Sequence, residues 1–66
     1  MRADNKLKEY RTGQGLSMQE LYAMSGVSPN TLVMIERYSH LPKPQTRQRL
    51  AKALQVDESI LFPEVE

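Results

Sequence analysis

The strongest constraint on this sequence is that 66 residues without a single cysteine must bury a hydrophobic core. A chain of this length lies near the lower limit for independent folding and holds one domain at most. Disulfides and cysteine-based zinc sites are excluded, and the one histidine, His40, cannot form a metal site alone. The core must therefore come from aliphatic packing, with self-association as a further source of stability.

Charge is distributed unevenly along the chain. Residues 1–52 hold all nine Lys and Arg against four acids, a net charge of +5, whereas residues 53–66 hold four acids and no base. A basic body suits a polyanionic partner, but on charge alone an ordinary solubilising surface is the better interpretation. No apolar run approaches the roughly 20 residues of a membrane span, and the segment MRADNKLKEY lacks the apolar stretch of a secretory signal. We therefore expect a soluble cytoplasmic protein.

A capping box marks the start of the second predicted helix. The Ser17 hydroxyl can accept from the backbone N–H of Glu20, and the Glu20 carboxylate can reach back to the backbone of Ser17. The helix then runs to about residue 25, with Leu21 and Met24 facing the core. Gly26 follows and can adopt the left-handed conformation of a sharp turn. An earlier helix, capped by Asp4 or Asn5, ends at Gly13 and Gly15.

The third predicted helix contains more apolar residues than one core face can hold. Ser28 caps it, Pro29 occupies the first helical position, and it ends at about residue 37 or 38. Within it the stretch LVMI (32–35) places four apolar residues in succession, and a helix cannot turn all four toward one core. The first and last fit the core spacing, which leaves Val33 and Met34 to face something else.

Two further helices complete the chain. The loop YSHLPKPQ (38–45) contains two prolines and is not helical. Thr46 can cap a fourth helix, which presents an apolar face formed by Leu50, Ala51 and Leu54, and Val56 then enters the core. Asp57 can cap a last short helix that runs through Ile60, Leu61 and Phe62 and that Pro63 stops. No stretch alternates as a strand would, so we expect an all-α domain with about five short helices.

A helix, a turn built on glycine and a second capped helix form the helix-turn-helix arrangement. The sequence also resembles one family closely, the Cro/C1-type (XRE) helix-turn-helix domains of phage repressors and bacterial regulators. The matching blocks are LKEYR (7–11), GLS (15–17), EL (20–21), GVS (26–28), Thr31, IER (35–37), Pro42 and AKALQV (51–56). They are ordered and spaced as in the family from about Lys6 to Phe62, and several such blocks are far more specific than any one of them.

The resemblance implies a compact five-helix, lambda-repressor-like DNA-binding domain over residues 1–66, with the helix-turn-helix unit at about residues 17–37. Residues 28–37 would form the recognition helix in the major groove. The implied base contacts are Met18, Pro29, Asn30, Val33 and Met34. The Asn30 amide can bond adenine N6 and N7, whereas the apolar side chains could touch only thymine methyls or sugars. Local hydrogen bonding for Asn30, and a protein interface for the apolar residues, stay open as alternatives.

The same resemblance implies contacts to the DNA backbone by Ser17, Ser28, Thr31, Arg37, His40, Lys43 and Arg47. The alternatives are helix capping for the hydroxyl groups and solvated surface charge for the basic groups. Arg11 and Glu36 occupy positions where the family places an ion pair between the first and third helices. Tyr22 departs from the family, which usually has alanine there, so its ring must lie along the surface or widen the helix crossing.

We therefore expect a sequence-specific regulator of transcription that binds double-stranded DNA, a repressor acting by operator occupancy. The alternative is a protein-interaction module on the same fold, such as an antitoxin or the adaptor head of a larger regulator. The sequence has no glycine-rich phosphate loop, and it offers no plausible nucleophile as a partner for His40. We therefore expect that the protein is not an enzyme and that it binds no cofactor or small-molecule ligand. A homodimer on DNA would use the apolar end bearing Ile60, Leu61, Phe62 and Val65, unless these residues close the core.

Overall fold

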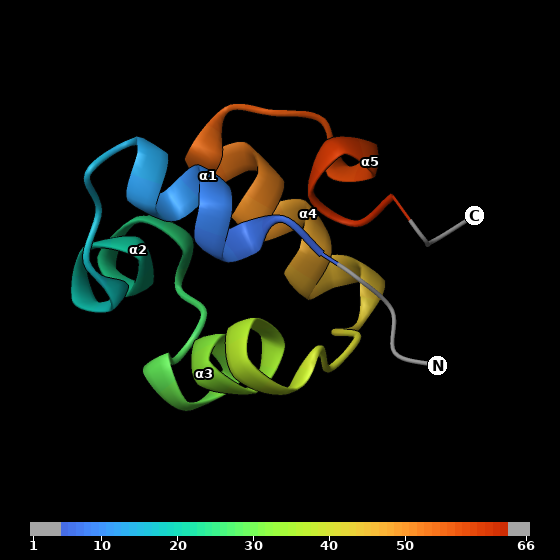
Figure 1. The fold of residues 1–66 in the computed structure, drawn as a ribbon, viewed down its shortest axis with the longest axis horizontal. Helices are drawn as coiled ribbons and strands as arrows, with labels where there is room; N and C mark the ends of the chain where they lie inside the picture. The colour runs from blue at the N-terminus through green and yellow to red at the C-terminus, as the bar shows by residue number, and fades with distance from the viewer. Residues whose placement is uncertain (1–4, 64–66) are drawn as a thin grey trace.

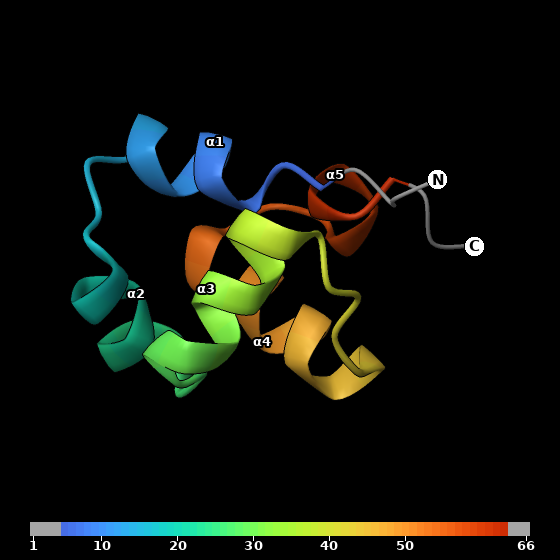
Figure 2. The ribbon, with the colours of Figure 1, turned by 60° about the horizontal axis from the view of Figure 1, so that its bottom comes forward.

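The computed structural model describes residues 5–63, and within them the chain forms five α-helices and no strand. The helices are α1 (Leu7–Gly13), α2 (Met18–Ser25), α3 (Pro29–Tyr38), α4 (Pro44–Leu54) and α5 (Glu58–Leu61). α2 packs against both α3 and α4. α1 packs against α3, and α4 packs against α5. Figures 1 and 2 both show α2 and α5 at opposite ends of the molecule. None of the described helices has the length and apolar composition needed to cross a membrane.

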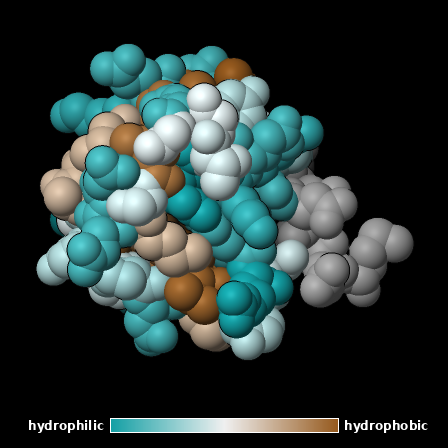
Figure 3. All heavy atoms as spheres, turned by 60° about the vertical axis from the view of Figure 1, so that its left-hand side comes forward, coloured by the Kyte–Doolittle hydropathy of each residue, from teal (hydrophilic) through white to brown (hydrophobic). Residues whose placement is uncertain are grey.

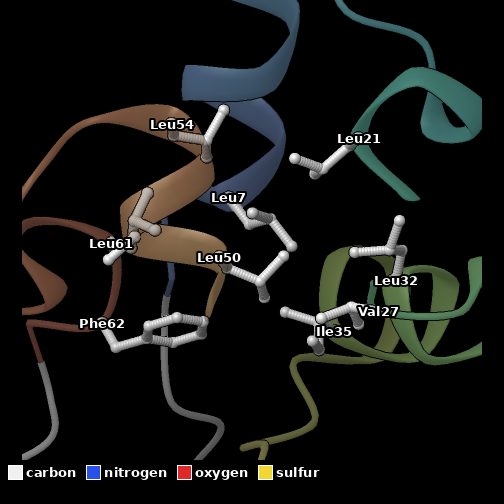
Figure 4. Close-up of a cluster of buried hydrophobic side chains, with 10 residues drawn as sticks. Leu7, Leu21, Val27, Leu32, Ile35, Leu50, Leu54, Leu61 and Phe62 are labelled. Carbon is white, nitrogen blue, oxygen red and sulfur yellow. The ribbon is translucent and has the colours of Figure 1, made fainter. Parts of the chain in front are cut away.

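Every helix contributes an aliphatic side chain to one central cluster. Figure 4 shows these side chains converging between the helices, with Leu7 from α1, Leu21 from α2, Ile35 from α3, Leu50 from α4 and Leu61 from α5. Each of these five is completely buried. Truncating a buried leucine to alanine costs about 2–5 kcal/mol. Because a small domain is stable by only about 5–15 kcal/mol, this one cluster decides whether the chain folds.

Local capping signals place the helix boundaries, with some differences from the sequence predictions. The N-cap of α1 is Lys6, without a side-chain cap hydrogen bond, rather than Asn5. The Asn5 side chain lies just before it, where it accepts from the backbone N–H of Leu7 and donates to the carbonyl of Ile35 in α3. Asp4, the alternative cap, lies outside the described residues. α4 begins at Pro44 rather than after Thr46, because proline is favoured at the first helical position, and its N-cap is Lys43. Asp57 is the N-cap of α5 without a side-chain hydrogen bond.

The structure also differs from two predictions about apolar side chains. Met24 was expected in the core but is 51% exposed, because α2 turns only Leu21 fully inward. At the other end of the chain, Leu61 and Phe62 are buried and close the core, so neither is free for self-association. Ile60 remains exposed on α5, and Val65 lies outside the described residues.

Candidate nucleic-acid interface

Capping signals define both ends of α2, the helix that precedes the turn. The Ser17 hydroxyl accepts from the N–H of Glu20 at 3.0 Å, and the Glu20 carboxylate accepts from the N–H of Ser17 at 2.8 Å. Gly26 ends α2 with a φ of 76°, a left-handed conformation that only glycine adopts without strain. Val27 is then buried, and this anchors the turn to the core. These features define how α3 packs against α2.

The start of α3 is capped by a pair of hydroxyl groups. The Ser28 hydroxyl oxygen accepts from the backbone N–H of Thr31 at 3.3 Å, and the Ser28 O–H donates to the Thr31 hydroxyl oxygen at 3.0 Å. Pro29 occupies the first helical position and is half-buried. Both hydroxyl groups therefore serve the helix cap, although Ser28 is exposed and retains a free face toward solvent.

The outer face of α3 carries most of the residues expected to touch bases. Asn30 is exposed and Met34 is 40% exposed, while Val33 is half-buried. Leu32 and Ile35 are completely buried. The four successive apolar residues therefore divide as the helical period requires, with two in the core and two outside it.

Met18 and Val33 come together at a groove between α1, the start of α2, and α3. The groove has a volume of about 250 Å³ and is lined by Lys8, Arg11, Met18, Val33, Glu36 and Arg37. Met18 also packs partly against the core cluster. The face of the molecule in Figure 3 shows apolar side chains standing among hydrophilic ones. Lys8 was not among the predicted site residues, although its spacing of three residues from Arg11 places both on one face of α1.

Arg11 and Glu36 form a two-point ion pair within this groove. Arg11 donates from Nε to Glu36 Oε2 at 2.7 Å and from Nη2 to Oε1 at 3.0 Å, and its Nη1 donates to the carbonyl of Leu16 at 2.7 Å. The side chains are only 11% and 3% exposed. The hydrogen bond that Arg11 donates to Glu36 raises the pKa of Arg11, against the opposing effect of burial. The pair ties α1 to α3 and leaves Glu36 with both oxygens occupied.

Arg47 does not lie where the sequence prediction placed it. The residue is 9% exposed, its Nε donates to Glu58 Oε2 at 2.7 Å, and its Nη1 donates to the carbonyl of Pro42 at 2.7 Å. The guanidinium is directed inward, and its Nε and Nη1 donors are engaged by Glu58 on α5 and by the buried carbonyl of Pro42, so little of it faces a DNA phosphate. We therefore remove Arg47 from the backbone contacts and assign it to the packing of α4, α5 and the preceding loop.

The other basic residues predicted to contact the DNA backbone are exposed to solvent. Arg37, His40 and Lys43 are all exposed, and neither Arg37 nor Lys43 forms an ion pair with another residue between 5 and 63. They lie at the end of α3 and in the loop that follows it. Tyr22 is 46% exposed, so its ring lies at the surface rather than between α2 and α3. Within residues 5–63, no three potential metal ligands cluster together.

Comparisons with known proteins agree with this arrangement. A family model described as helix-turn-helix matches residues 7–61. The chain is similar to the structure of the restriction-modification controller protein C.AhdI from Aeromonas hydrophila, with 32% identity, 86% of each chain covered and a TM-score of 0.79. It is also similar to the N-terminal DNA binding domain of SinR from Bacillus subtilis, with 31% identity, 80% of this chain and 78% of that chain covered, and a TM-score of 0.75. No curated protein sequence matches the chain.

Proposed function

The chain belongs to the helix-turn-helix family, and we propose that it represses transcription by occupying a DNA operator through α3. It is a sequence-specific DNA-binding transcriptional regulator of the Cro/C1 type. The observation that carries the proposal is the exposed face of α3, held by the caps at Ser17 and Ser28 and by the ion pair between Arg11 and Glu36. Its two similar structures are described as a restriction-modification controller and a DNA-binding domain, which supports regulation through DNA.

Base recognition in this proposal centres on Asn30. Its exposed amide lies in the first turn of α3, the part of a recognition helix that meets base edges. A bidentate amide selects adenine by bonding to N6 and N7. Met34 would add apolar contact to a thymine methyl group, with Pro29, Met18 and Val33 at the margins of the same surface. With one polar base-reading group on α3 before Arg37, DNA shape supplies part of the specificity.

Contacts to the DNA backbone in this proposal come from groups around α2 and α3. Arg37 in the last turn of the recognition helix, and His40 and Lys43 in the loop that follows it, supply exposed basic or polar side chains. Ser17, Ser28 and Thr31 lie at helix starts, where backbone N–H groups and the helix dipole favour a phosphate. Such contacts fix the position of the protein on the duplex without selecting its sequence.

A homodimer is part of the proposal because operators of this motif consist of two half-sites about one helical turn apart. Ile60 supports a role for α5 in that dimer. It is 39% exposed, whereas the two residues that follow it are buried. It therefore offers an apolar side chain for contact with a second copy, at the end of the molecule opposite α2.

A protein-interaction module is the second candidate, and the exposed apolar residues favour it. Tyr22, Met24 and Met34 are each at least 40% exposed, although each lies on the helix-turn-helix unit. An apolar surface of this kind is typical of protein contacts. The two functions differ in their response to salt, because counterions leave DNA when basic groups bind its phosphates.

The experiment that tests the proposed function is equilibrium binding to a labelled duplex at several salt concentrations. We expect log K to fall linearly with log salt, by about 0.9 per phosphate neutralised. Binding of a protein partner through Met34 should respond weakly to salt. A chain that binds duplex DNA undetectably even at low salt would contradict the proposed function.

A further inference from the structure

Lys8 lies on α1, outside the helix-turn-helix unit, yet its side chain lines the groove described above. We propose that this groove seats one phosphate of the DNA backbone, with Lys8 and Arg37 as its counter-charges. The inference rests on the proposed function and extends it, since it adds α1 to the DNA-binding surface and names a contact that the helix-turn-helix unit alone does not supply.

The charges that line the groove favour an anion. Three cationic side chains and one carboxylate surround it. Arg11 engages both oxygens of Glu36, so this carboxylate is neutralised locally. Lys8 and Arg37 are exposed and form no ion pair with any residue between 5 and 63. The groove therefore retains two uncompensated positive charges beside a neutral ion pair.

The shape and position of the groove fit a phosphate of a bound duplex. Its volume of about 250 Å³ is far larger than the roughly 10–15 Å³ that one water molecule requires, so a solvated phosphodiester has room. Met18 and Val33 supply the apolar part of its wall. Val33 adjoins Met34 in α3, so the groove borders the surface assigned to bases.

The Arg11–Glu36 pair sets a condition for this site. If Arg11 is absent, the nearly buried Glu36 carboxylate lies uncompensated in the groove lining and repels a phosphate. The pair therefore supports the site by keeping Glu36 neutralised, in addition to joining α1 and α3. Lys8 and Arg37 provide the direct contacts.

The test compares Lys8→Ala with Lys52→Ala, which removes the same charge from an exposed lysine in the last turn of α4 and away from the groove. Both variants are measured against a duplex selected from a random pool by the wild-type protein. The salt slope is determined for each variant. Methylphosphonate groups, which are uncharged, then replace the duplex phosphates one at a time, and Arg37→Ala is measured on the same set. Thermal unfolding checks that each variant is folded.

We expect Lys8→Ala to flatten the salt slope by about one unit, while Lys52→Ala leaves it at the wild-type value. We also expect one methylphosphonate position that weakens wild-type binding severalfold. The same position should have a much smaller effect on Lys8→Ala and on Arg37→Ala, and an undiminished effect on Lys52→Ala.

Two outcomes would overturn the inference while leaving the proposed function intact. In the first, the wild-type protein binds the selected duplex with a steep salt slope, but Lys8→Ala shows the same slope. In the second, Lys8→Ala and Arg37→Ala lose sensitivity at different phosphates, which means that the groove does not hold one shared phosphate. Failure of the wild-type protein to bind any duplex would instead contradict the proposed function itself.

Discussion

Arg11 and Glu36 join α1 to α3 through two hydrogen bonds, Nε to Oε2 at 2.7 Å and Nη2 to Oε1 at 3.0 Å, across 25 residues of sequence. Glu36 is the more deeply buried partner, with 3% of its side chain exposed. A buried ion pair adds little net stability when intact, but removal of one partner leaves an uncompensated charge. The structure therefore makes this pair costly to break.

We expect Glu36→Ala to lower the free energy of unfolding by about 3 kcal/mol, because the nearly buried Arg11 guanidinium then lacks its counter-charge. The double change Arg11→Met/Glu36→Leu should recover part of that loss. Urea unfolding of the wild type, Arg11→Met, Glu36→Leu and the double variant forms a double-mutant cycle. Additive effects, with no coupling energy, would show that the two residues act independently.

The pH dependence of the pair follows from the direction of the Arg11 shift. Glu36 raises the pKa of Arg11 in the folded protein, so the stability that this shift contributes is fully present below the unfolded pKa of arginine. It is lost only when pH rises through the higher, folded value. We therefore expect the difference in unfolding free energy between wild type and Arg11→Met to stay constant between neutral and mildly alkaline pH. A progressive loss over that interval would be inconsistent with the raised pKa.

Asn30→Ala should cost roughly 1–3 kcal/mol of binding free energy on the preferred duplex and relax the preference at one base position. The expectation follows from the exposed position of the amide in the first turn of α3. Fluorescence anisotropy at one fixed salt concentration, with all four bases at each position, measures both effects. Identical base preferences in wild type and variant would remove Asn30 from the base contacts.

Met34→Ser separates a DNA contact from a protein interface. Because Met34 is 40% exposed, we expect the melting temperature to change little, as surface substitutions shift stability by less than about 0.5 kcal/mol. Affinity for the selected duplex should fall, and the preference for thymine over cytosine should shrink at one position. Val33→Ser provides a comparison that should also cost stability, since Val33 is half-buried. A change in sedimentation with unaltered base preference would indicate that Met34 belongs to a protein interface.

Arg47→Ala should lower the stability of the fold without removing a contact to a DNA phosphate. Its guanidinium joins Glu58 and the Pro42 carbonyl, so we expect a loss of unfolding free energy of about 1–3 kcal/mol from the two unpaired groups. The salt slope of DNA binding should match that of the wild type, whereas Arg37→Ala should flatten it by about one unit. An equal flattening by both variants would restore Arg47 to the backbone contacts.

The sequence predicted features that depend on neighbouring residues. The capping box of Ser17 and Glu20 and the left-handed Gly26 are local signals, and both are present in the structure. The period of α3 likewise identified Leu32 and Ile35 as the core pair. These features require only the chemistry of a few consecutive residues and the geometry of a helix.

Apart from the Arg11–Glu36 pair, which the family resemblance supplied, predictions that depended on distant partners were less successful. Arg47 is drawn inward by a carboxylate on α5 and a carbonyl in the preceding loop, and neither partner can be recognised from the residues around Arg47. Met24 is exposed because the packing of α2 selects one inward residue from two suitable candidates. Lys8 shares a face of α1 with Arg11, but the groove it lines forms only when α1, α2 and α3 meet.

Selection of bound duplexes from a random DNA pool tests the central claim most directly, because it measures binding and specificity together. We predict enrichment of a short motif in two half-sites whose centres lie about 10 base pairs apart, with an adenine whose preference is lost for Asn30→Ala. Recovery of unenriched sequences by the folded wild-type protein would contradict sequence-specific recognition through α3.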